Sequence, residues 1–175
     1  MTFLEEVLMR HLTKKAESPK HKAYLINQKI EDIRATLFRQ TLFAEFELQL
    51  HTWAENGVPL TPSLLKETYL KLNREYYGPD LAIDPLLAIE WARIPHFYYN
   101  YYVYQYATGL SAALSLFTQA MQSDEAKKRY LAFLSSGGSQ YPIDLLKIAG
   151  VDMTKPDAVQ AAMEYFKTLM REMTP

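Results

Sequence analysis

The stretch KAYLINQKIEDIRATLFRQTLFAEFELQLHTWA, residues 22–54, decides the fold of this chain. Its apolar residues recur at three- and four-residue steps, which is the period of a helix that buries one face. Glu55-Asn56-Gly57 follows as a stop signal. We therefore predict one long helix from about Lys22 to Ala54. Its expected inward face comprises Leu25, Ile26, Ile30, Ile33, Leu37, Ala44 and Leu48.

The helical period continues on both sides of this stretch, and no segment alternates with the period of a strand. Short polar residues followed by proline, or glycine pairs, mark the expected helix ends. The sequence therefore predicts an all-α, multi-helix single domain over residues 1–175. The further helices are expected up to about Ala16, from Thr61-Pro62 to Tyr77, from Pro85 to Trp91, from His96 or Phe97 to Met121, from Ser123 to Gly137, from Pro142 to Gly150, and from Pro156 onward with Val159, Met163, Phe166 and Met170 inward.

Composition excludes several classes of function. A net charge of −1 gives no electrostatic reason for nucleic acid or an anionic membrane as partner. The absence of cysteine excludes disulfides, thiolate nucleophiles and cysteine-based zinc sites, and it fits a reducing cytoplasm. The first residues lack the pattern of a signal peptide, and no apolar run approaches the roughly 20 residues of a membrane span. We expect a cytoplasmic, globular protein.

The segment RIPHFYYNYYVYQYATG, residues 93–109, carries the strongest functional signal. One histidine follows a proline, and six tyrosines lie within the next nine positions from Tyr98 to Tyr106. A buried phenol needs a hydrogen-bond partner, so an ordinary core would use leucine or phenylalanine instead. The pattern indicates a wall that faces a polar ligand. The alternative is an aromatic packing helix with its hydroxyls at the rim.

His96 and Tyr104 lie eight residues apart, which is about two turns if the helix is regular. A histidine donor and a phenol donor on one face could stabilise charge that develops on a carbonyl oxygen. The other histidines carry weaker signals. His11 and His21 read as surface residues, and the Glu47/His51 pair reads more readily as a solvated helix face than as a metal site.

Several strings of the chain resemble the C-terminal region of oligoendopeptidase F, a branch of the thimet-oligopeptidase-like M3 zinc metallopeptidases. The resemblance runs in order over essentially the whole chain. The strings are TLFRQTLFAEFE at residues 36–47, YYGP at 76–79, EWARIPHFY at 90–98, YVYQYATG at 102–109, SGGS at 136–139 and AGVDM at 149–153.

The resemblance implies that the zinc-binding half of the site is missing from this chain. The family's His-Glu-x-x-His helix lies upstream, and its third ligand, a glutamate, would fall just before Met1. Glu5 matches a later family glutamate that resembles a carboxylate orienting a zinc-bound histidine. The resemblance therefore implies zinc in the complete enzyme, whereas this chain is expected to contain no metal ligand and to bind no cofactor.

The resemblance also implies roles for the His96 segment. His96 matches a family histidine that donates a hydrogen bond to the substrate, and Tyr104 best matches the tyrosine that stabilises the oxyanion. Tyr98, Tyr101 and Tyr102 match the substrate wall less closely.

We expect this chain to be the C-terminal helical part of a peptidase for short peptides, to pair with the N-terminal part of that enzyme, and to be inactive alone. The alternative is a non-catalytic helical module for binding or packing, such as a truncated gene product. Apolar faces left exposed would favour self-association.

Overall fold

Short polar side chains and prolines set the helix starts. In the computed structural model, which describes residues 2–173, the Ser18 hydroxyl accepts a hydrogen bond from the His21 amide and Pro19 opens the helix. Thr61 and Ser123 cap two further helices in the same way. Each cap satisfies one of the amides that has no partner inside its own helix. The starts at Thr61 and Ser123 confirm the sequence-based prediction, whereas α2 begins at Pro19 rather than at the predicted Lys22.

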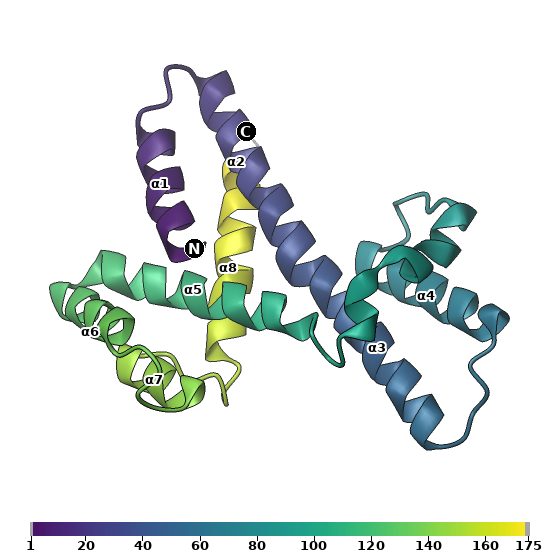
Figure 1. The fold of residues 1–175 in the computed structure, drawn as a ribbon. Coiled ribbons are helices and arrows are strands. Elements are labelled where there is room, and N and C mark those ends of the chain that lie inside the picture. Colours follow the sequence, from purple (N-terminus) through teal and green to yellow (C-terminus); the bar gives the residue numbers. More distant parts are fainter. Residues whose placement is uncertain (1, 174–175) are drawn as a thin grey trace. The chain divides into compact units, whose positions relative to one another are not determined.

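All regular elements among the described residues are helical, which confirms the predicted all-α class (Figure 1). Eight are α-helices, one is a π-helical turn and two are 3-10 helices. In chain order they are α1 (Thr2–Lys14), α2 (Pro19–Ile33), η1 (Arg34–Phe38), α3 (Arg39–Glu55), α4 (Pro62–Tyr77), η2 (Pro85–Arg93), η3 (Pro95–Tyr98), α5 (Tyr104–Gln122), α6 (Asp124–Ser135), α7 (Pro142–Ala149) and α8 (Asp157–Met173).

The long helix predicted from Lys22 to Ala54 is present as α2, η1 and α3, but its inward face shifts at the π-helical turn. A π-helical turn holds one more residue than an α-helical turn. The step from buried Leu37 to buried Leu42 is accordingly five residues, where a regular helix would give three or four. Leu48, predicted to face inward, is therefore 55% exposed. The residues that are buried instead are Leu42, Phe43, Phe46 and Glu47.

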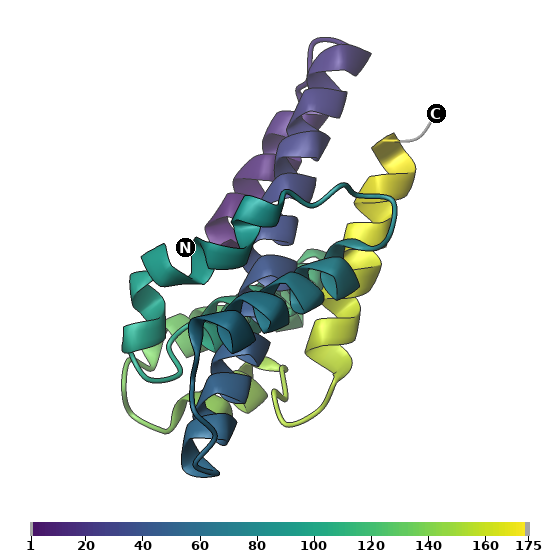
Figure 2. The ribbon, with the colours of Figure 1, turned by 90° about the vertical axis from the view of Figure 1, so that its right-hand side faces the viewer.

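The helices form two compact units, of which unit 1 comprises the residues up to Ala35 and those from Thr108 onward. Within it α2 packs against α8 and against α1, which lies beside it in Figure 2, and α6 packs against α7. In α8 the predicted inward face was wrong for Val159 and Met170, which are 42% and 46% exposed, whereas Met163 and Phe166 are partly buried. Small side chains let neighbouring helices approach closely, so α8 turns its alanines inward. Its buried residues are Ala158, Ala162 and Leu169.

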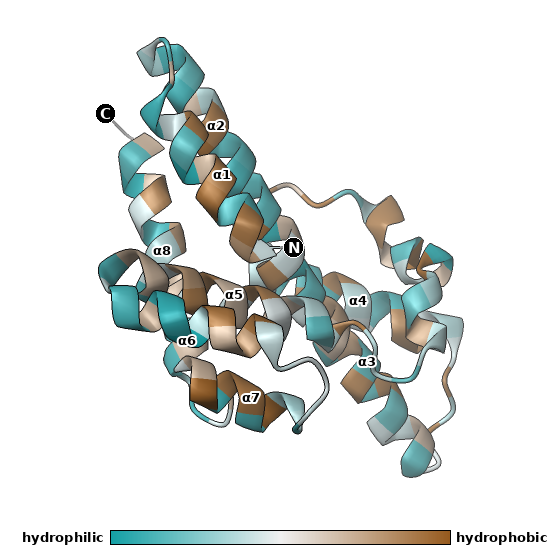
Figure 3. Ribbon diagram, turned by 60° about the vertical axis from the view of Figure 1, so that its left-hand side comes forward, coloured by the Kyte–Doolittle hydropathy of each residue, from teal (hydrophilic) through white to brown (hydrophobic). Residues whose placement is uncertain are grey.

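Helix α1 leaves an apolar face exposed. Leu4 and Leu8 are 64% and 55% exposed, and Figure 3 shows the hydrophobic colour along this helix. Val7 and Leu12 add to the same exposed surface. In the part of the chain that the structure describes, no helix is both long and apolar enough to cross a membrane.

Unit 2 comprises Thr36–Ala107. Helix α4 packs against both α3 and η2. The core contains Phe46 and Tyr69, both fully buried, and their rings meet edge to face at 5.2 Å. The partly buried Phe97 packs against this core through Phe43 and Phe46. The core therefore anchors the residue next to His96.

Candidate active site

Prolines divide the chain before α5 into short turns. Residue Ile94 precedes a proline and is extended, with φ −92° and ψ 103°, because that position disfavours the helical conformation. The 3-10 helix η3 lasts only from Pro95 to Tyr98, and α5 begins at Tyr104. The predicted start at His96 or Phe97 is therefore wrong, whereas the predicted end at Met121 agrees with α5 to within one residue. His96 and Tyr104 do not share a face through two turns of one helix.

Two left-handed residues connect η3 to α5. Asn100 has φ 48° and Tyr101 has φ 61°. This conformation costs about 1–2 kcal/mol per residue, and asparagine tolerates it better than tyrosine does. The Tyr101 amide donates a hydrogen bond to Oε1 of Glu47 at 2.7 Å. A hydrogen bond to a charged group contributes about 1.5–3 kcal/mol, so this contact is large enough to offset the strain at Tyr101.

His96 lies among three tyrosine rings. The Tyr106 hydroxyl and Nε2 of His96 are 3.3 Å apart and share a hydrogen bond. The Tyr102 ring stacks on the imidazole with centroids 5.6 Å apart, and Tyr99 meets it edge to face at 5.9 Å. All three belong to the six-tyrosine pattern, but only Tyr102 had been given a substrate-binding role, and Tyr99 and Tyr106 had not. The imidazole is thus held by aromatic contacts and one phenol.

Tyr104 lies with a second group of residues. It lines a cavity of about 380 Å³ together with Tyr101 and the buried Glu47. The Tyr101 ring stacks on His51 with centroids 4.3 Å apart. Nε2 of His51 is 3.9 Å from Oε1 of Glu47, so the carboxylate, the imidazole and the tyrosine form one contact group. The remaining lining residues are Thr41, Ala44, Glu45 and Leu48.

The phenols of this segment are accessible hydrogen-bond donors. Tyr98 is 79% exposed and Tyr104 is 51% exposed. Hydrogen bonding to Tyr102 raises the pKa of Tyr106, and desolvation with the charges of two glutamates raises the pKa of Tyr101. Since an ordinary tyrosine already titrates near pH 10, both hydroxyls keep their protons at neutral pH.

A partly buried carboxylate fixes the turn that precedes His96. Glu90 in η2 accepts a hydrogen bond from the Tyr69 hydroxyl at 2.7 Å and pairs with Arg39 of α3 and with Arg93. Burial alone would raise the pKa of Glu90, but the Tyr69 hydrogen bond and the Arg39 charge outweigh it and hold that pKa below its usual value. The η2 segment is thereby tied to α3 and α4, ahead of the proline that leads to His96.

In unit 1, Glu5 is exposed on α1, and the neighbouring Glu6 is the buried carboxylate. Glu6 pairs with the buried Lys29 and accepts a hydrogen bond from the Tyr165 hydroxyl at 3.0 Å. Burial lowers the pKa of Lys29. The role predicted for Glu5 stays a prediction. The contact group of Glu6, Lys29 and Tyr165 was not predicted from the sequence.

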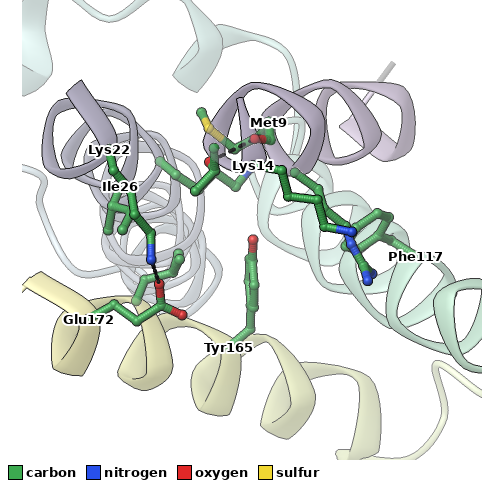
Figure 4. A pocket seen from close by; sticks show the side chains of 11 residues that line it. Met9, Lys14, Lys22, Ile26, Phe117, Tyr165 and Glu172 are labelled. Atoms are coloured by element: carbon green, nitrogen blue, oxygen red, sulfur yellow. Dashed lines mark hydrogen bonds and ion pairs between the residues drawn. The ribbon is translucent and has the colours of Figure 1, made fainter. Parts of the chain in front are cut away.

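A second cavity of about 380 Å³ lies in unit 1 between α1, α2, α5 and α8. Figure 4 shows the Tyr165 ring directed into it, and the ion pair of Lys22 with Glu172 at its edge, 3.5 Å long. The polar groups of Lys29 and Tyr165, which both line the cavity, bind the buried Glu6.

Comparison with known proteins identifies the chain. The family model described as "Peptidase family M3" matches residues 2–165. The chain belongs to peptidase family M3. Oligopeptidase PepF of Bacillus subtilis is 51% identical over 170 residues, which cover 97% of this chain and 25% of that relative. An oligoendopeptidase F homolog of Borreliella burgdorferi is 41% identical over 97% of this chain and 29% of its own length.

Solved structures agree with this assignment. The crystal structure of oligoendopeptidase-F from Enterococcus faecium superposes with a TM-score of 0.93 at 46% identity, over 98% of this chain and 33% of that one. A putative peptidase from Chlamydophila abortus gives 0.92 at 44% identity. This M3 chain therefore spans between a quarter and a third of the length of these relatives.

The residues of this chain do not fit a catalytic zinc ion by themselves. Across residues 2–173, no three histidine, aspartate or glutamate side chains gather closely enough to hold a metal. Glu47 and His51 are a pair without a third ligand, and the Tyr101 amide already occupies one carboxylate oxygen.

The structure thus brings His96 together with Tyr102, and Tyr101 together with Tyr104. The hydrogen bond of His96 to a phenol is made with Tyr106, which lies ten residues further along the chain. The helical period does not predict this ten-residue spacing, because the irregular segment between η3 and α5 determines which residues meet. The catalytic and substrate-binding roles of these residues stay predictions.

Proposed function

We propose that this M3 chain is the C-terminal part of an oligoendopeptidase F-type zinc endopeptidase that hydrolyses short peptides. The observation that carries the proposal is the set of accessible phenols around the partly buried His96. Membership of family M3 and the high similarity to oligoendopeptidase F structures support it. In this view the chain supplies the wall that faces the peptide.

The chemistry of this wall is hydrogen-bond donation. In the complete enzyme, zinc bound by the rest of the protein would activate the attacking water. His96 and Tyr104 would donate hydrogen bonds to the peptide carbonyl oxygen as it gains negative charge. Tyr98, Tyr101 and Tyr102 would hold the substrate chain. Tyr102 also supports the imidazole by stacking on it.

The N-terminal part of the peptidase is the proposed partner of this chain. The exposed apolar face of α1, with Leu4 and Leu8, offers it a surface, and the same face favours self-association when that part is absent. We propose that the chain alone does not cleave peptides. The same exposed face suits the second candidate, a non-catalytic helical module for packing or binding.

A chimera tests the proposed function. Residues 2–173 replace the matching segment of the Bacillus subtilis relative, and cleavage of a short quenched fluorescent peptide is measured with and without zinc. We expect a zinc-dependent activity that this chain alone does not show. A soluble, folded chimera without activity would favour the non-catalytic module.

Two variants of the chimera then test the assigned roles. Tyr104→Phe removes one donor to the developing charge and should lower kcat by about 10²–10³ with little change in KM. His96→Gln should also lower kcat. Tyr141→Phe, which alters an 81% exposed tyrosine elsewhere, is the control and should leave both constants unchanged. Equal changes in kcat and KM for Tyr104→Phe would make Tyr104 a binding residue.

A further inference from the structure

Glu47 is a buried charge that the proposed chemistry does not use. It lies on α3 and is 1% exposed. Its Oε1 accepts the Tyr101 amide hydrogen at 2.7 Å, a contact between residues 54 positions apart. Its Oε2 is buried, and among the described residues it has no hydrogen-bond partner. Buried carboxylate oxygens are normally satisfied, so the position of this side chain needs a reason.

The Tyr101 backbone supplies that reason. Asn100 and Tyr101 both lie in the left-handed region, which a residue with a large side chain rarely occupies unless its surroundings hold it there. Glu47 holds the amide of Tyr101, and His51, one helical turn further along α3, stacks on its ring. One face of α3 therefore fixes both the backbone and the side chain of Tyr101.

The conformation of these two residues decides where the neighbouring tyrosines point. On the N-terminal side the chain comes from His96, and on the C-terminal side Tyr102 stacks back on that imidazole. Tyr104 begins α5 and shares a cavity wall with Tyr101 and Glu47. A change of φ at Tyr101 would rotate Tyr102 and Tyr104 together, so the contact at Glu47 sets the geometry of the wall.

We propose that Glu47 is a positioning residue, whose carboxylate holds the Asn100–Tyr101 turn in its left-handed conformation and so places Tyr102 against His96 and Tyr104 at the start of α5. The consequence for catalysis rests on the function proposed above. The consequence for the turn does not, and it can be measured on this chain without any activity.

Exchange of the Tyr101 amide hydrogen tests the contact directly. Glu47→Asp keeps the charge but shortens the side chain by one methylene, so the 2.7 Å contact is lost. Glu47→Gln keeps the length and an acceptor oxygen but removes the charge. Exchange of the Tyr101 amide hydrogen, followed by NMR, should accelerate about tenfold or more in Glu47→Asp, which loses the hydrogen bond. It should accelerate less in Glu47→Gln, which keeps a hydrogen bond, although a neutral acceptor bonds only about half as strongly as a charged one.

The matched control is Tyr76→Phe. It removes another side-chain hydrogen bond to an α3 carboxylate, the 2.8 Å contact between Tyr76 and Glu45, but touches no residue of the turn. Its Tyr101 exchange rate should equal that of the unaltered chain. Equal acceleration in Tyr76→Phe and Glu47→Asp would mean that the whole unit has loosened, and it would overturn the proposal.

Kinetics and rescue test the positioning role in the chimera. Glu47→Asp should lower kcat about tenfold or more, since small misplacements of donors weaken transition-state stabilisation. Adding Asn100→Gly should recover most of the loss, because glycine adopts the left-handed conformation freely and the turn then depends less on Glu47. Asn100 is exposed and has no assigned role in catalysis.

Unchanged Tyr101 exchange in both Glu47 variants overturns the proposal. So does a loss of kcat that Asn100→Gly fails to recover. An inactive chimera would count against the proposed peptidase function only, because the exchange measurements on this chain would still decide whether Glu47 holds the turn.

Discussion

Each unit of the molecule buries a glutamate, but the two carboxylates are satisfied in different ways. In unit 1, Glu6 is fully buried, pairs with Lys29 and accepts a hydrogen bond from the Tyr165 hydroxyl. Its partners are side chains from two other helices. In unit 2, Glu47 is equally buried, but its hydrogen-bond donor is the backbone amide of Tyr101.

The two glutamates differ in the contact that offsets the free-energy cost of burying them. An ion pair between helices makes Glu6 part of the packing of α1, α2 and α8. The Glu47 contact holds a strained turn in place and leaves Oε2 without a hydrogen-bond partner among the described residues. A carboxylate that stabilises an unfavourable backbone conformation beside exposed tyrosines indicates a site more strongly than one that completes a core.

Breaking the unit 1 pair should have the largest effect. Lys29→Ala leaves Glu6 buried without its counter-charge and should lower the free energy of unfolding by about 3–5 kcal/mol. Urea unfolding followed by far-UV circular dichroism measures it. Lys22→Ala, on the same helix, breaks the largely exposed pair with Glu172 and should cost less than about 1 kcal/mol.

A double variant sharpens this result. Glu6→Leu combined with Lys29→Met replaces the pair by apolar side chains of similar size, and such replacements are often neutral. It should therefore be more stable than Lys29→Ala. Equal, small losses in Lys29→Ala and Lys22→Ala would contradict the assignment of Glu6 as a structural carboxylate.

The ends of the helices could be predicted from the sequence because they depend on local chemistry. Thr61 before Pro62 offers a capping oxygen and a residue that needs no amide partner, and Ser123 offers a capping oxygen before Asp124. These signals involve neighbours in the chain. They are therefore visible without any knowledge of what packs against the helix.

The inward faces and the site geometry could not be read in this way. The π-helical turn at Arg34–Phe38 shifts the face of α3, and no residue type marks such a turn. Glu6 and Glu47 look like surface charges, because only tertiary contacts reveal their partners. The left-handed turn at Tyr101 is equally hidden, since it depends on an acceptor 54 residues away.

Within unit 2, Tyr69→Phe should have a smaller effect than the loss of Lys29. It removes the 2.7 Å hydrogen bond to the partly buried Glu90 and should cost about 1.5–3 kcal/mol, since a charged acceptor loses a donor. Tryptophan fluorescence during urea unfolding reports on this unit, because Trp53 and Trp91 both lie in it. Tyr76→Phe, whose bond to Glu45 is less buried, should cost less. The reverse order would show that Glu90 does not anchor η2.

Titration of Glu90 should give the smallest effect, because its partner Arg93 is largely exposed and solvent screens that pair. The pKa of Glu90 is lowered in the folded chain, so the folded state binds the proton more weakly than the unfolded state. Its stabilisation is therefore present above the unfolded pKa, near 4.3, and is lost as the pH falls through the lower folded pKa.

The experiment is urea unfolding by tryptophan fluorescence between about pH 7 and pH 3, for the unaltered chain and for Glu90→Gln. The difference in unfolding free energy between the two should shrink as the pH falls, because protonated Glu90 resembles the amide. The other carboxyls whose pKa is lowered lie in unit 1, so subtracting the variant isolates Glu90 within unit 2. If the unfolding free energies of the two proteins changed in parallel with pH, Arg39 and Tyr69 would not stabilise the charged carboxylate. Unit 2, unlike unit 1, would then contain no glutamate that is stabilised by neighbouring side chains.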